Sequence, residues 1–125
     1  MAYYRPSTDH IQMPDESRFT GARREEDYYS VLWHEAGHWS GAASRLARDL
    51  TGRFGTAAYA MEELVAELTA SFMCAELGIS ATPRADHAAY LANWLTVMKS
   101  DKKAIFTAAA KASEAARYLM SKAPA

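Results

Sequence analysis

The sequence contains one cysteine, Cys74, among 125 residues, and no apolar stretch long enough to cross a bilayer. A lone cysteine cannot form an internal disulfide, and a cysteine-based zinc site needs several thiolates, so both are excluded. The longest apolar stretches meet a glutamate within a few residues, whereas a membrane-spanning helix needs about 20 apolar residues in a row. The first residues also lack the basic and apolar segments of a secretory signal. We therefore expect a protein of the reducing cytoplasm that does not contact a membrane.

An excess of positive charge is missing as well. Fourteen Lys and Arg residues stand against 15 Asp and Glu residues, which gives a formal net charge of −1. Because proteins that bind nucleic acid neutralise its phosphates with a basic surface, we do not expect this chain to bind nucleic acid directly. Half of the residues are hydrophobic and 23% are charged, which is typical of a folded globular protein. The length predicts one domain, residues 1–125.

The residue pattern predicts a mainly α-helical protein of the α+β class. Two short strands around a polar turn predict a small β-hairpin within residues 1–14. Apolar residues at helical spacing predict four helices, at about 25–40, 56–77, 82–100 and 102–120. Gly78 is expected to end the second of these helices.

A metal-binding pattern lies in the first predicted helix, where His34, Glu35 and His38 form the HExxH arrangement of zinc hydrolases. Residues four apart share a helix face, so both imidazoles can reach one ion at about 2.0–2.1 Å, with Glu35 beside the open coordination position. Zinc lowers the pKa of its bound water toward about 7, and a nearby carboxylate can complete the deprotonation and protonate the leaving amine. Two ordinary histidines are the alternative, but their uncharged neighbours would make an unpaired acid costly. The pattern therefore predicts amide hydrolysis with Glu35 as general base.

A catalytic zinc ion needs a third protein ligand. The three-histidine pattern HExxHxxGxxH would place it at position 44, where this chain has Ser44, so that class is disfavoured. In the second predicted helix, Glu63 and Glu67 share one face with alanines, and small residues on both helices permit close packing. This arrangement predicts Glu63 as the third ligand and Glu67 one turn away as the partner of a histidine, while Glu62 is expected to point elsewhere.

Other roles are open to these glutamates and to several further residues. The three glutamates could form a solvated helix face, and Glu67 could pair with Arg45 or Arg48 instead of a histidine. The hairpin could bind substrate as an added strand or only cover the helices. In the third predicted helix, His87 and Tyr90 could donate a hydrogen bond to an oxyanion or simply pack. Cys74 is expected to be a buried thiol, and His10 has no predicted role.

Several segments together are more specific than the metal-binding pattern alone: residues 4–9, 11, 13–14, 28–29, 34–41, 45–48, 59–67 and 87–95. Across nearly its whole length the sequence resembles the C-terminal zincin-like metallopeptidase domain of ArdC-type antirestriction proteins, which plasmids and phages carry. The resemblance implies a zincin-like helical domain that binds one Zn²⁺ through His34, His38 and Glu63, with Glu35 as catalytic acid and base. The Ala36-Gly37 pair replaces the Leu-Thr often found in the family, at positions that hold no ligand. The family's upstream domain, which binds single-stranded DNA, is expected to be absent from this chain.

The leading expectation is a zinc-dependent metallopeptidase domain that hydrolyses a protein or peptide substrate. The alternative is a non-catalytic antirestriction or partner-binding module, for example a DNA mimic, in which the metal is structural. Glu35 separates the two, because Glu35→Gln should keep zinc and abolish turnover but leave a binding module unaffected. A third possibility, a metal-free chain with a helical interaction surface, requires the acidic residues to be solvated.

Overall fold

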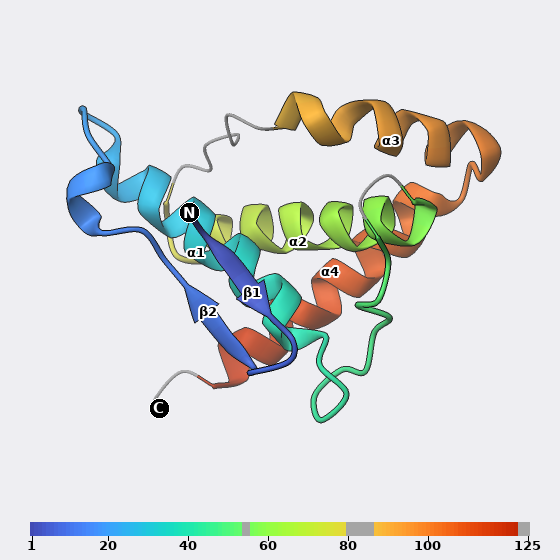
Figure 1. The fold of residues 1–125 in the computed structure, drawn as a ribbon, viewed down its shortest axis with the longest axis horizontal. Coiled ribbons are helices and arrows are strands. Elements are labelled where there is room, and N and C mark those ends of the chain that lie inside the picture. The colour runs from blue at the N-terminus through green and yellow to red at the C-terminus, as the bar shows by residue number, and fades with distance from the viewer. Residues whose placement is uncertain (54–55, 80–86, 123–125) are drawn as a thin grey trace.

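The computed structural model describes residues 1–53, 56–79 and 87–122, without the side chains of residues 87–93. Four helices and a two-stranded sheet make up the described part, which confirms the predicted mainly α-helical class (Figure 1). In chain order the elements are β1 (Tyr3–Arg5), β2 (His10–Gln12), the short 3₁₀ helix η1 (Glu16–Arg18), α1 (Arg24–Ser40), α2 (Ala57–Glu76), α3 (His87–Ser100) and α4 (Ala104–Ser121). The predicted start of the third helix, Thr82, lies outside the described residues.

The hairpin is antiparallel, and Tyr4 pairs with Ile11 at its centre. Its turn contains Asp9 at φ 53°, a left-handed conformation that aspartate tolerates better than most residues. The hairpin lies against α1, and Arg45 fastens it there by pairing with Asp9 and lying 3.8 Å above the ring of Trp39. The loop after α1 therefore holds both the hairpin and the end of that helix.

Helix α2 lies in the middle of the fold, and α1, α3 and α4 all pack against it (Figure 1). Thr56 caps its N-terminus by accepting a hydrogen bond from the Tyr59 amide at 3.2 Å, and Gly78 follows its C-terminus at φ +69° as predicted. Small residues fill much of the core; the buried alanines are Ala36, Ala60, Ala66, Ala70, Ala104, Ala108, Ala112, Ala115 and Ala116. Small side chains allow the helix backbones to approach each other closely.

At Gly37, helices α1 and α2 lie close together. A Cβ atom at this position would lie 3.1 Å from the Cα of Ala66 and 3.2 Å from the Cβ of Thr69. The close packing expected from the small residues is therefore present, and it brings the motif helix against the glutamates of α2. Among the described residues, no helix is both long and apolar enough to span a membrane.

Candidate metal centre

Three side chains from α1 and α2 converge at one point. The Nε2 atoms of His34 and His38 lie 3.2 Å apart; that of His34 lies 3.1 Å from Oε2 of Glu63 and that of His38 lies 3.1 Å from Oε1. In a tetrahedral site with bonds of about 2.0 Å, ligand atoms are about 3.3 Å apart. The exposed fraction is only 2% for the side chain of His34 and 8% for that of Glu63. The donor set and its spacing therefore fit a divalent metal ion bound by two imidazoles and one carboxylate.

The outer nitrogen of each imidazole meets a different glutamate of α2. His34 Nδ1 pairs with Glu67, which is one of the contacts that the sequence left open for this glutamate. His38 Nδ1 lies 2.9 Å from Oε2 of Glu62. Because a carboxylate at Nδ1 fixes the ring orientation and leaves Nε2 to face the metal position, both rings are held for ligation.

The expectation that Glu62 points elsewhere is wrong. The helical spacing of α2 indicates that the Cα–Cβ bonds of Glu62 and Glu63 point in different directions. The imidazole of His38 has a nitrogen on each of two sides, however, so it can contact both glutamates. The solvated-face alternative is also wrong, since the side chains of Glu62, Glu63 and Glu67 are only 12%, 8% and 16% exposed. The arginines have other partners: Arg48 pairs with Glu62 and Arg45 with Asp9.

Protonation of the cluster follows from its burial and its ion pairs. Burial lowers the pKa of His38, but hydrogen bonds with Glu62 and Glu63 outweigh this effect and raise it to about 10. The pKa of His34 is raised in the same way by Glu63 and Glu67 against the effect of burial. Burial raises the pKa of Glu63, but the two histidines hold it well below its usual range. A metal ion would displace the proton that the raised pKa keeps on the imidazole of His38 in its absence.

Glu35 is buried beside the two histidines, with a carboxylate oxygen within 4.8 Å of a nitrogen of each ring. It lies in the same helix as the two histidines, beside the contacts that join them to Glu63. It also lines the cleft that leads to the histidines. A carboxylate there can reach a water molecule or a carbonyl group brought to the same point.

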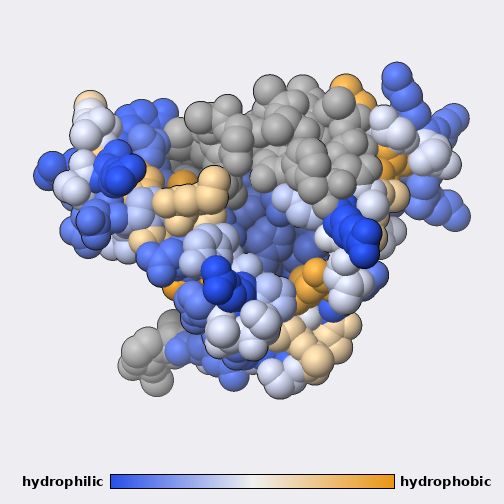
Figure 2. Space-filling view, viewed as in Figure 1, coloured by the Kyte–Doolittle hydropathy of each residue, from blue (hydrophilic) through white to orange (hydrophobic). Residues whose placement is uncertain are grey.

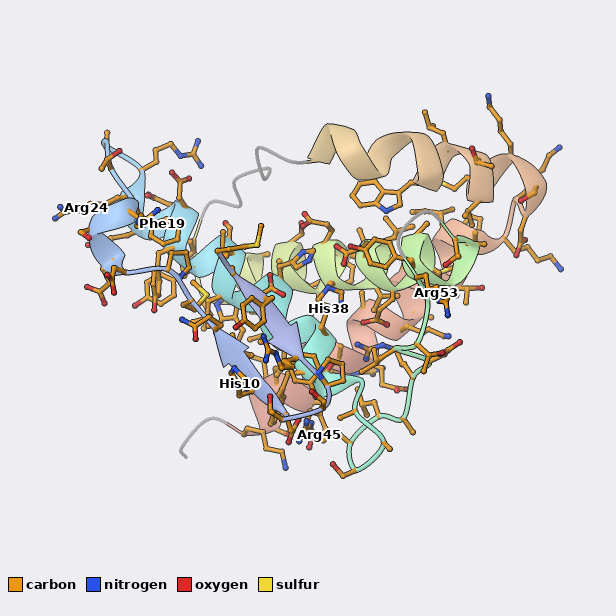
Figure 3. All side chains as sticks on the ribbon, in the orientation of Figure 1. His10, Phe19, Arg24, His38, Arg45 and Arg53 are labelled. Carbon is orange, nitrogen blue, oxygen red and sulfur yellow. The ribbon has the colours of Figure 1, made fainter. Side chains whose placement is uncertain are left out.

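The histidines lie at the bottom of a cleft of about 250 Å³. His38 lies where α1 passes between the hairpin and α2 (Figure 3). A hydrophilic recess opens in the middle of this face of the molecule (Figure 2). The hairpin forms one wall and the loop with the start of α2 another; the lining residues outside the histidine cluster are Ala2, Tyr4, Pro6, Leu50, Gly52, Tyr59 and Glu62.

The remaining candidates lie elsewhere. His87 and Tyr90 belong to the first turns of α3, but their side chains lie outside the described residues. Cys74 is buried as predicted, with Ser30 Oγ 3.9 Å from its sulfur. His10 lies on the exposed hairpin and contacts Thr8 at 2.5 Å. Residue spacing did not indicate a role at the site for Glu62 or for Arg48, which holds it, although both occur in segments that carry the family resemblance.

Known proteins resemble this chain over almost its entire length. The Mn(II)-bound structure of the antirestriction protein ArdC from plasmid R388 superposes with a TM-score of 0.84 and 41% identity, over 97% of this chain and 44% of that one. Its metal-free structure gives a TM-score of 0.80 and 43% identity, over 96% of this chain and 42% of that one.

Two sequence relatives complete the comparison. An uncharacterized protein, y4eC, of Sinorhizobium fredii is 56% identical over 94% of this chain and 38% of its own length. A DNA primase TraC of Escherichia coli is 44% identical over 95% of this chain and 11% of its own length. The chain thus spans less than half of each of these proteins. The family described as zincin-like metallopeptidase matches residues 1–111, and the chain belongs to that family.

Proposed function

We propose that this chain is a metallopeptidase domain that holds one divalent ion, preferentially Zn²⁺, through His34, His38 and Glu63. The observation that carries the proposal is the close approach of their donor atoms: the two Nε2 atoms lie 3.2 Å apart, and each lies 3.1 Å from a different carboxylate oxygen of Glu63. Two imidazoles and a carboxylate are the ligand set of many catalytic zinc sites. The Mn(II) in the related ArdC structure supports a divalent ion and leaves the metal's identity to be tested.

Glu35 acts as the general base and then as the general acid in this proposal. A bound divalent ion would supply Lewis acidity, which lowers the pKa of water and polarises a peptide carbonyl. Glu35 takes a proton from the water whose oxygen forms the new bond to the carbonyl carbon. It then gives that proton to the amine nitrogen as the C–N bond breaks.

The substrate that we propose for the cleft is an extended peptide and not a nucleic acid. Within the described part of the chain, strand β1 pairs with β2 alone, and Tyr4 from β1 lines the cleft. A peptide can therefore add along β1 by backbone hydrogen bonds and bring its carbonyl group to the histidines. The net charge of −1 offers no general attraction for phosphates, so the proposed substrate is a protein or peptide.

The decisive experiment compares metal content and peptide hydrolysis in the purified chain and two variants. We expect Glu63→Ala to lose the metal, and Glu35→Gln to retain one equivalent of Zn²⁺ but lose hydrolysis of a quenched-fluorescent peptide library. Glu25→Gln, on the exposed start of α1, is the matched control and should behave like the wild type. A wild-type chain that binds no zinc, or a Glu35→Gln variant that cleaves at the wild-type rate, would contradict the proposal.

A second candidate is an antirestriction module that acts by binding, with a structural metal. The description of the related R388 protein as antirestriction ArdC favours this possibility. In that case Glu35→Gln would leave the biological effect unchanged, so a restriction-protection assay with this variant in the full-length protein separates the two candidates.

A further inference from the structure

We propose that Arg48 is a positioning residue of the metal centre, which holds Glu62 and through it fixes the imidazole of His38. The inference rests on the proposed metal site. It adds a residue that lies outside the HExxH segment, in the loop between α1 and α2. Its basis is a continuous set of hydrogen bonds from the loop to the histidine.

Arg48 binds the carboxylate of Glu62 with two nitrogens. Its Nε donates to Oε1 at 2.9 Å, and its Nη2 donates to Oε2 at 3.1 Å. A two-point contact of this kind fixes the plane of a carboxylate as well as its position. Oε2 of that carboxylate lies 2.9 Å from Nδ1 of His38, so the plane that Arg48 sets also sets the direction of the imidazole.

The guanidinium is itself anchored on the end of α1. Nη2 donates to the backbone oxygen of Gly37 at 2.5 Å, and Nη1 donates to Oγ of Ser40 at 3.1 Å. The backbone amide of Arg48 donates to the oxygen of Gly41 at 2.9 Å. With its side chain only 6% exposed, Arg48 connects the helix that carries His38 to the helix that carries Glu62. A lysine ammonium cannot reproduce this planar set of donors.

Gly41 leaves the space that the guanidinium occupies. A Cβ atom at this position would lie 2.7 Å from Nη2 and 2.8 Å from Cζ of Arg48. The φ of Gly41 is −85°, which any residue can adopt, so the constraint is space and not backbone conformation. Gly41→Ala should therefore displace the flexible arginine without removing a hydrogen-bonding group from the site.

The experiment measures Zn²⁺ affinity by chelator competition and the visible absorption of the Co²⁺-substituted chain. We expect Arg48→Met to weaken Zn²⁺ binding about 10–100-fold and to shift the Co²⁺ bands, because the orientation of one imidazole is no longer fixed. Arg48→Lys and Gly41→Ala should cause smaller changes in the same direction. Thermal unfolding without metal shows how much of each effect is a general loss of stability.

A double-mutant cycle tests whether Arg48 acts through Glu62. Each single substitution, Arg48→Met or Glu62→Gln, removes the same link to His38. The double variant should therefore bind Zn²⁺ as tightly as the more weakly binding single variant, and the two losses of affinity should not add. Arg45→Met is the matched control, because Arg45 is also bound to the end of α1 but reaches Asp9 instead of Glu62. It should leave the Co²⁺ spectrum unchanged.

Two results would overturn the inference while leaving the proposed function intact. One is wild-type zinc affinity and an unchanged Co²⁺ spectrum in both Arg48→Met and Gly41→Ala. The other is a double variant in which the two losses of affinity simply add. A wild-type chain that binds no zinc would instead overturn the proposed function, and this inference with it.

Discussion

The Cβ atom that Gly37 lacks would lie 3.1 Å from the Cα of Ala66. Because the nearest atom belongs to the backbone of α2, an added methyl group must push the two helices apart. Overpacking costs about 1–3 kcal/mol, whereas replacing glycine by alanine in a helix gains up to about 1 kcal/mol. We expect Gly37→Ala to lower the free energy of unfolding by about 1 kcal/mol and to weaken Zn²⁺ binding, since Glu63 moves away from the histidines. Chemical denaturation and chelator competition measure these two effects.

A control for this substitution is Ser71→Ala, on an exposed position of α2. It should change stability by no more than about 0.5 kcal/mol. Unchanged zinc affinity in Gly37→Ala would mean that the helix contact does not set the position of Glu63.

The affinity for zinc should rise with pH. The glutamates raise the pKa of both histidines, to about 10 for His38, so without metal the imidazole of His38 is protonated at neutral pH. Zinc must displace the proton from the nitrogen of His38 that it binds. We expect at least one proton to be released per zinc at pH 7, measured by titration calorimetry in buffers of different ionisation enthalpy. Zinc binding without proton release would contradict this picture of the metal-free cluster.

The stability of the metal-free chain should change with pH in the opposite direction. A histidine whose pKa is raised by folding contributes stability below its unfolded pKa of about 6.5, and that contribution is lost as pH rises through the folded pKa. For His38 this window extends to about pH 10. Denaturant midpoints of the metal-free chain should therefore fall between about pH 6.5 and 10, while those of the zinc-loaded chain change less. If the denaturant midpoints of the metal-free and zinc-loaded chains changed equally with pH, the raised pKa of His38 would not explain the pH dependence.

Glu67 should affect zinc binding through His34. Its carboxylate pairs with Nδ1 of that ring, opposite the nitrogen that faces Glu63. We expect Glu67→Gln to weaken zinc binding about 10-fold or more, because a neutral amide orients the ring less strongly. Glu76→Gln, on an exposed position at the end of the same helix, is the control and should bind zinc normally. Chelator competition at constant pH gives both values.

Part of this site follows from local sequence patterns and part does not. The HExxH segment is contiguous, so the helix period alone brings His34 and His38 to one face. The sequence also suggested Glu63, because alanines beside it signal a close helix contact; the structure places it 3.1 Å from both rings, and its role as a ligand stays a prediction. Such patterns can be predicted because the face of the helix that the local period defines is also the face that makes the tertiary contact.

The contacts made through the loop could not be predicted in this way. Arg48 reaches Glu62 only because residues 41–53 fold back over the end of α1, and that path has no repeating hydrophobic pattern. Long side chains also depart from the direction of their Cα–Cβ bonds, so the spacing along α2 does not predict the contact between Glu62 and His38. The hairpin residues Tyr4 and Pro6 reach the cleft through docking of the whole hairpin, a tertiary contact that strand patterns do not encode.

Removal of the metal should lower thermal stability through His34, His38 and Glu63 together. These three side chains meet in a buried cluster, and an ion that binds the folded chain alone shifts the folding equilibrium toward it. At a free zinc concentration of about 100 times Kd the stabilisation is about 2.7 kcal/mol, which corresponds to a rise in Tm of about 10 °C for a chain of this size. We expect differential scanning fluorimetry to show this rise in the wild type and EDTA to reverse it.

Glu63→Ala should have a lower Tm without metal, because two buried histidines lose their partner, and no response to zinc. A zinc-dependent rise that persists in Glu63→Ala would show that the ion stabilises the chain from another site.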